Sequence, residues 1–166
     1  MKKLIFILIA AILITSCASN ISERQAGILD STVPVSTGEN TQNFSDVEGK
    51  NWQLIEVHTE NEIIQIDRYI QQDVYVITFS NGTVSGTGAP NRYSAPYNLG
   101  SGSEISIMPL ISTLMAPIFE ISNLSEHEYY TFLQNSYMWE LVNNTLELYS
   151  RTDDNRDIKL VFSSSL

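Results

Sequence analysis

Residues 74–87 read Val-Tyr-Val-Ile-Thr-Phe-Ser-Asn-Gly-Thr-Val-Ser-Gly-Thr and contain the clearest structural signal in this 166-residue chain. The first six are all β-branched or aromatic, and such side chains pack well on a pleated sheet. Asn81-Gly82 lies between two runs of this kind, where both residues tolerate the positive φ of a tight turn. We therefore predict a β-hairpin with strands over residues 74–79 and 83–87.

Short runs of similar texture continue on both sides of this hairpin. They cover residues 52–57, 63–66, 105–108, 137–142, 145–149 and 158–162, and Asn143-Asn144 provides another tight turn. In the last three runs apolar and polar residues alternate, as on strands with one buried face. The side predicted to face inward holds Tyr137, Trp139, Leu141, Leu146, Leu148, Ile158, Leu160 and Phe162. Many short strands with turns between them are typical of an antiparallel sheet or barrel.

One helix is predicted, over residues 126–135. Ser125-Glu126-His127-Glu128 matches the capping box, in which the serine and the third-position glutamate bond each other's backbone N–H groups. An apolar stripe at helical spacing follows, formed by Tyr129, Phe132 and Leu133. We expect this stripe to pack on the sheet. The fold class is therefore mainly β, a small antiparallel β-barrel-like sheet with one packed α-helix.

The N-terminus has the features of a cleavable export signal. Lys2 and Lys3 precede an uncharged apolar run over residues 4–14, which is shorter than the about 20 residues that a membrane-spanning helix needs. Ile14-Thr15-Ser16-Cys17 then resembles a lipobox, the bacterial signal for lipidation and cleavage just before a cysteine. That resemblance implies removal of residues 1–16, lipidation of Cys17, and a lipid-anchored location in the bacterial cell envelope, at the inner or outer membrane. An ordinary secretory signal with a chance cysteine, or a buried N-terminal helix, remain the alternatives.

Composition divides the rest of the chain into a linker and a domain. Residues 18–46 are rich in Ser, Thr, Asn, Gln and Gly, so they bury too little apolar surface to offset ordering. We predict that residues 17–46 are the lipidated cysteine and a flexible tether, and that residues 47–166 form one domain. The alternative is that Ile28-Leu29, or Val33 with Val35, dock on the domain as an extra strand.

The charge of the chain argues against a nucleic-acid partner. Its formal net charge is −10, and it becomes −12 once Lys2 and Lys3 are removed with the signal. Binding to nucleic acid or to anionic headgroups depends on Lys and Arg, so such a surface repels both. Cys17 is the chain's single cysteine, which leaves no internal disulfide. We expect a monomer, held at the membrane by its lipid.

A series of motifs resembles the META/HslJ-like domain, in order and spacing. The opening Gly-x-x-Trp-x-Leu corresponds to residues 49–54, and residues 79–86 resemble the family's first hairpin. Its other motifs are matched by residues 88–93 (Gly-x-Cys-Asn-x-Tyr), 111–117 (Thr-x-Met-Ala-Cys), 126–133 (the acidic helix start) and 146–148 (the penultimate strand). The resemblance implies an envelope lipoprotein with a small barrel-like fold, in a family linked to stress and antibiotic tolerance without an established enzymatic activity.

The chain departs from that family pattern at two positions. Where the family commonly has cysteine, this sequence has Pro90 and Pro117. Loss of both together is coherent, because one cysteine left over would be a reactive thiol. Paired cysteines are therefore no required catalytic or redox feature here.

Residues able to carry out catalysis are sparse. His58 and His127 are the only histidines and have no ligand spacing. Asp153-Asp154-Asn155-Arg156-Asp157 lacks the glycine and distal glutamate of a calcium-binding EF-hand loop and is interpreted as a turn. Neither a Gly-x-Ser-x-Gly motif nor a phosphate-binding loop is present. We predict no metal site, no cofactor and no enzymatic activity.

One group of residues remains as a tentative binding site: Asn91, Arg92, Tyr93, Tyr97, Thr113 and Met115. In a structural interpretation, Asn91 and Thr113 lock loops through hydrogen bonds. In a functional one, two loops border one barrel end, Arg92 grips a carboxylate or a peptide backbone, and the tyrosines supply flat apolar area.

Two functions follow from these interpretations. The first is a non-catalytic envelope lipoprotein that binds a peptide, protein or lipidic ligand and supports stress tolerance. The second is an assembly factor, because some META members are similar in fold to pilotins, which chaperone secretion pores. A pilotin-like protein would carry a partner peptide or lipid in the barrel cleft. An elongated apolar cavity would favour ligand or helix binding, and a solid core with a flat patch near Arg92 would favour protein docking.

Overall fold

A computed structural model describes residues 42–67, 73–116 and 124–164 of the chain. Cys17, the predicted signal and residues 17–41 of the predicted tether lie outside these residues, and so does Pro117. The elements of the described part are η1 (Phe44–Asp46, a 3-10 helix), β1 (Trp52–His58), β2 (Ile63–Gln65), β3 (Val76–Ser80), β4 (Thr83–Thr87), β5 (Arg92–Leu99), β6 (Ile105–Ile107), β7 (Ile111–Ser112), α1 (Glu126–Gln134), β8 (Met138–Val142), β9 (Thr145–Arg151) and β10 (Asp157–Ser164).

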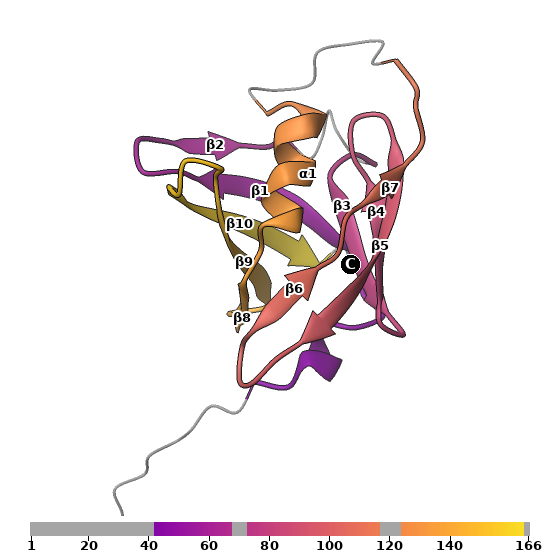
Figure 1. The fold of residues 1–166 in the computed structure, drawn as a ribbon. Coiled ribbons are helices and arrows are strands. Elements are labelled where there is room, and N and C mark those ends of the chain that lie inside the picture. The colour runs from indigo at the N-terminus through magenta and orange to yellow at the C-terminus, as the bar shows by residue number, and fades with distance from the viewer. Residues whose placement is uncertain (1–41, 68–72, 117–123, 165–166) are drawn as a thin grey trace, which may run out of the picture. The chain divides into compact units, whose positions relative to one another are not determined.

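The strands form one antiparallel sheet that curls into a nearly closed barrel (Figure 1). Its order is β6-β5-β4-β3-β1-β10-β9-β8, with β2 added to β1 and β7 added to β5. The two ends of this path meet where the Ile105 N–H donates to the Tyr137 carbonyl at 3.1 Å and the Trp139 N–H donates to the Ser103 carbonyl at 2.9 Å. The predicted fold class is confirmed.

Both predicted tight turns are present. Asn81 and Gly82 have φ values of 50° and 73°, and they join β3 to β4 in the register Ser80↔Thr83. Asn143 and Asn144, with φ of 49° and 66°, join β8 to β9 in the same way. Residues that accept positive φ at little cost therefore set the register of two hairpins.

Strand β5 was not predicted from the sequence, which placed residues 91–93 in a loop. It is one of the two longest described strands, and its side chains alternate between exposed and buried over residues 92–98, with Tyr93, Ala95 and Tyr97 buried. Pro96, which is depleted in strands, and the small residues beside it obscured the pattern. Pro96 fits because its position in the sheet requires only a hydrogen-bond acceptor. Its carbonyl accepts a hydrogen bond from the Met108 N–H at 2.9 Å.

Helix α1 closes one end of the barrel, and its capping box is formed as predicted. Ser125 Oγ accepts the Glu128 N–H at 3.2 Å, and Glu128 Oε2 accepts the Ser125 N–H at 2.9 Å. The predicted apolar stripe of Tyr129, Phe132 and Leu133 is buried. Asn135, predicted as the last helical residue, is the C-cap.

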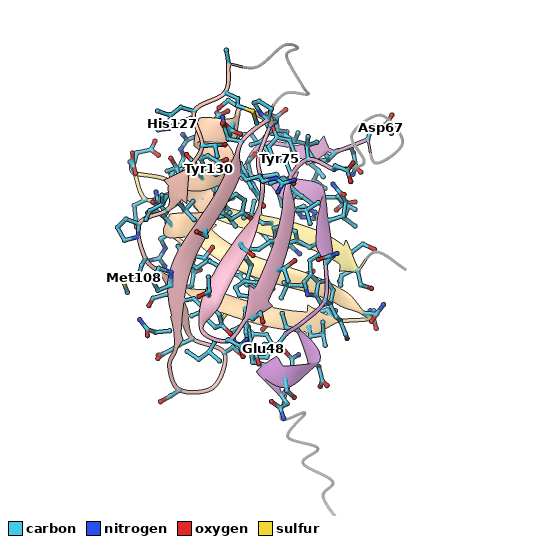
Figure 2. All side chains as sticks on the ribbon, turned by 90° about the vertical axis from the view of Figure 1, so that its right-hand side faces the viewer. Glu48, Asp67, Tyr75, Met108, His127 and Tyr130 are labelled. Atoms are coloured by element: carbon cyan, nitrogen blue, oxygen red, sulfur yellow. The ribbon has the colours of Figure 1, made fainter. Side chains whose placement is uncertain are left out.

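The opposite end of the barrel is closed by Phe44 of η1. Its ring centroid lies 5.2 Å from that of Phe79 and 4.9 Å from that of Trp139. Figure 2 shows Tyr75 and Tyr130 at the α1 end and Glu48 at the η1 end. Aromatic side chains from both ends thus fill the space between the strands, so the described barrel has a solid core.

The predicted domain boundary at Val47 is too late by at least five residues. Phe44 is only 6% exposed, and the side-chain amide of Gln42 both donates to the Leu141 carbonyl, at 3.1 Å, and accepts the Leu141 N–H, at 2.8 Å. A single buried phenylalanine contributes on the order of 2 kcal/mol. Polar composition around Phe44 concealed this anchor, and the folded domain includes residues 42–46.

Candidate functional site

Asn91 is the centre of a buried hydrogen-bond cluster. The residue is 5% exposed, and its Oδ1 accepts the Thr113 hydroxyl at 2.9 Å and the Met115 N–H at 2.7 Å. Its Nδ2 donates to the Met115 carbonyl at 3.2 Å and to Glu126 Oε2 at 2.6 Å. Its backbone N–H donates to Glu126 Oε1 at 2.7 Å. The side-chain amide therefore uses all of its donors and acceptors within the protein.

This cluster holds three distant segments together: the turn before β5, the loop after β7 and the start of α1. The Tyr130 hydroxyl adds a hydrogen bond to the Asn91 carbonyl at 3.1 Å. A Cβ at Gly88 would lie 2.5 Å from both Glu126 Oε1 and the Tyr130 hydroxyl. The close approach of residue 88 to α1 therefore depends on glycine. Asn91 and Thr113 therefore have the structural role that the sequence offered as one of two interpretations.

Tyr93 and Tyr97 lie inside the barrel, so the prediction that they form an exposed flat surface is wrong. They are 4% and 7% exposed because both lie on the inward side of β5. The Tyr93 hydroxyl donates to the Val76 carbonyl at 3.1 Å and lies 2.9 Å from the Tyr129 hydroxyl. Tyr97 donates to the Glu48 carboxylate. Desolvation by burial raises the pKa of both phenols well above the ordinary value.

Of the predicted site, Arg92, Thr113 and Met115 remain accessible. Arg92 lies on the outward side of β5 and is joined to Thr113 through the Arg92 carbonyl, which accepts the Thr113 N–H at 3.0 Å. It also lines a polar hollow of about 630 Å³ together with Asn51, Thr78, Ser85 and Thr87.

Two apolar residues that the site prediction missed accompany Met115. Ile111 is 78% exposed, Leu114 is 98% exposed and Met115 is 52% exposed. We call these three residues the apolar ridge. They lie within five residues of one another along the chain. The pairing of β7 with β5 places this segment next to Arg92. The one sequence signal was the pair of apolar groups in residues 110–116, which Ser112 and Thr113 separate without strand alternation.

The histidines and the Asp-rich loop make local contacts. The imidazole of His58 binds the Glu56 carboxylate at 2.6 Å, and this hydrogen bond lowers the pKa of Glu56. In the loop between β9 and β10, Asp154 accepts the Thr152 hydroxyl at 2.5 Å and Arg156 Nε at 2.9 Å. Within residues 42–67, 73–116 and 124–164, no three His, Cys, Asp or Glu side chains are grouped so as to hold a metal ion.

Comparison with solved structures shows similar folds in two proteins. One, an NMR structure of a protein from Burkholderia xenovorans, has a TM-score of 0.56 and 18% identity over 89% of this chain and 99% of the other. The second, a crystal structure of a DUF4847 family protein from Bacteroides vulgatus, has a TM-score of 0.50 and 13% identity over 72% of this chain and 95% of the other. At such identities the likeness concerns the fold alone. Among curated proteins, no relative matches.

A family model gives the assignment. The model of the META domain matches residues 45–161, which include the Asn91 cluster, the apolar ridge and all ten of the described strands in whole or in part. Its first matched residue lies beside Phe44, in agreement with a domain that starts before Val47. The chain therefore belongs to the META domain family.

Proposed function

We propose that this protein is a non-catalytic lipoprotein of the bacterial envelope, whose META domain binds a peptide or protein partner through the apolar ridge and supports the envelope under stress. The observation that carries the proposal is the exposure of Ile111, Leu114 and Met115 on one short segment. Single exposed apolar side chains are ordinary on protein surfaces, but a group of large ones marks an interaction site.

The chemistry around the ridge supports binding rather than catalysis. The Asn91 cluster engages its donors and acceptors internally, so it offers a reacting group neither a base nor a nucleophile. Arg92, beside the ridge, provides a planar set of donors for a carboxylate or a peptide carbonyl. The solid core gives no support to the pilotin-like alternative, in which a partner would lie in a cleft of the barrel.

The location of the ridge fits attachment of the protein through its N-terminus. The described chain begins at Gln42, at the η1 end of the barrel, and the loop after β7 lies at the α1 end (Figure 1). A lipid on Cys17 would thus be joined to the domain through Gln42, at the end of the barrel opposite to α1. In the part of the chain that the structure covers, no helix combines the length and hydropathy needed to traverse a bilayer.

Lipidation is tested by Cys17→Ala. We expect the variant to move from the membrane fraction to the soluble fraction while its circular dichroism and thermal transition stay unchanged, because the hydrophobic core is built from side chains between Phe44 and Phe162. The measurement is fractionation with metabolic labelling by a palmitate analogue. Unchanged membrane association together with no label in the wild-type chain would refute the anchor.

The ridge is tested by the double variant Ile111→Ser/Leu114→Ser. Because both side chains are exposed, the free energy of unfolding should change by less than about 1 kcal/mol in total. Crosslinking in intact envelopes should nevertheless lose the wild-type adduct. The matched control is Leu99→Ser/Val142→Ser, which removes exposed apolar side chains elsewhere and should keep the adduct. An adduct that survives the ridge variant, or that disappears from both, contradicts the proposal.

A further inference from the structure

A second concave surface lies between the β1–β2 hairpin, α1 and the β9–β10 loop, with a volume of about 440 Å³. These three segments lie side by side at the α1 end of the barrel, where β2, α1 and the loop between β9 and β10 converge (Figure 1). We call it the acidic groove. None of the three ridge residues lines it, so it is independent of the binding surface proposed above.

The floor of the acidic groove is apolar. It is formed by Ile64 of β2, Leu124 before α1, Phe132 of α1 and Ile158 of β10. Leu124, Phe132 and Ile158 are at most 9% exposed, so their positions are set by the core. This floor is a preformed apolar surface able to receive an aliphatic or aromatic side chain.

The rim of the groove is strongly negative. Its acidic residues are Glu60, Glu62, Glu128, Asp153, Asp154 and Asp157, whereas its basic residues are Arg156 and His127. Asp154 is paired with Arg156 at 2.9 Å, and Asp157 is paired with Arg151 at 3.2 Å. Among the described residues, Glu60, Glu62 and Asp153 form no ion pair.

We infer that the acidic groove binds a basic segment of a partner protein, in which an apolar side chain fills the floor and flanking Lys or Arg side chains meet the rim. Charge complementarity selects the sign of the partner, because a negative rim around a low-dielectric floor concentrates positive charge. Lys and Arg fit both parts, since their stems bury along apolar surface while their charged ends reach the carboxylates. The apolar floor favours a peptide over a small polyamine, and the negative rim repels anionic lipid headgroups.

The test measures calorimetric binding of a capped hexapeptide of alternating Leu and Lys to the full-length chain in nonionic detergent. We expect the double variant Glu60→Lys/Glu62→Lys to weaken binding at least about tenfold. Asp153→Lys, on the opposite side of the groove, is a second variant and should also weaken binding. The control Asp46→Lys/Asp73→Lys makes the same change of net charge outside the groove and should retain the affinity. A Lys-Ser hexapeptide should bind at least about tenfold more weakly than the Leu-Lys peptide, because it lacks the apolar side chains.

Several results would overturn the inference. Equal weakening by groove and control variants would mean attraction to the net charge of the chain alone. Equal binding of the Lys-Ser peptide, or of spermidine at the same concentration, would mean that the floor has no role. Absence of measurable Leu-Lys binding at low salt would remove the site altogether, and circular dichroism of each variant separates these outcomes from misfolding. Because the ridge is untouched, crosslinking through the ridge is expected to persist in the groove variants.

Discussion

Asn91→Asp is expected to lower the free energy of unfolding by about 3 kcal/mol, although the two side chains have nearly the same shape. The introduced carboxylate keeps the two hydrogen bonds that Oδ1 accepts from Thr113 and Met115. It loses both hydrogen bonds that Nδ2 donates, and it faces Glu126 Oε2 across 2.6 Å. Two carboxylates at this distance in a buried cluster repel each other. Urea denaturation at neutral pH measures the loss.

The matched control for Asn91→Asp is Asn98→Asp, on the outward side of the same strand. Asn98 is exposed, so that change should cost less than about 0.5 kcal/mol. Adding Glu126→Gln to Asn91→Asp should recover part of the stability, because the new amide donates to the introduced carboxylate while its oxygen still accepts the backbone N–H. The double-mutant cycle isolates that pairwise energy. Equal costs at positions 91 and 98 would show that the cluster does not hold the loops.

Gly86→Ala is expected to destabilise the domain by at least about 3 kcal/mol, the upper part of the range for overpacked interiors. An added Cβ would lie 1.8 Å from the Val76 carbonyl oxygen and 2.8 Å from the Tyr93 hydroxyl. The first atom belongs to the backbone of the neighbouring strand and cannot rotate away. Relief of the clash would separate β3 from β4 and break the hydrogen bond from Tyr93 to Val76. Thermal unfolding followed by circular dichroism measures the change.

Gly102→Ala separates this clash from the general cost of replacing glycine. Gly102 has a φ of 63° and no heavy atom within 4 Å of an added Cβ, so its substitution carries only the left-handed backbone cost of about 1 kcal/mol. If Gly86→Ala were no more harmful than Gly102→Ala, the close approach of Gly86 to Val76 would be wrong.

Local signals explain which parts of the fold were predictable. Asn81-Gly82, Asn143-Asn144 and the capping box at Ser125 act on their immediate neighbours, and the structure confirms all three. Strand β5 was missed because Pro96 and the small residues beside it obscure the alternation. Phe44 depends instead on partners far away in the sequence. Phe44 is buried only because the barrel places Phe79 and Trp139 around it, which no local pattern around residue 44 records.

The candidate site was predicted only in part: Met115 was named, Ile111 and Leu114 were missed, and the orientation of the tyrosines was wrong. Whether Tyr93 faces solvent or the core depends on the register of β5 against β4, where Gly86 lies opposite Tyr93. A shift of one residue would exchange the exposed and buried sides. The acidic groove was hidden for a related reason, because Glu60, Glu128 and Asp153 come from three elements that meet only in the folded chain.

The pairing of β1 with β10 determines how early in synthesis the barrel can form. The first full-length strand of the sheet lies beside the last, from Trp52↔Ser164 to His58↔Lys159, and β10 also separates β1 from β9. A chain emerging from the ribosome can form the β3–β4–β5 and β8–β9 portions early, but it lacks the strand that joins them until residues 157–164 have been made. Such long-range pairing slows folding. The strands on the two sides of β10 therefore cannot join into one sheet before residues 157–164 are available, because β10 pairs with both β1 and β9.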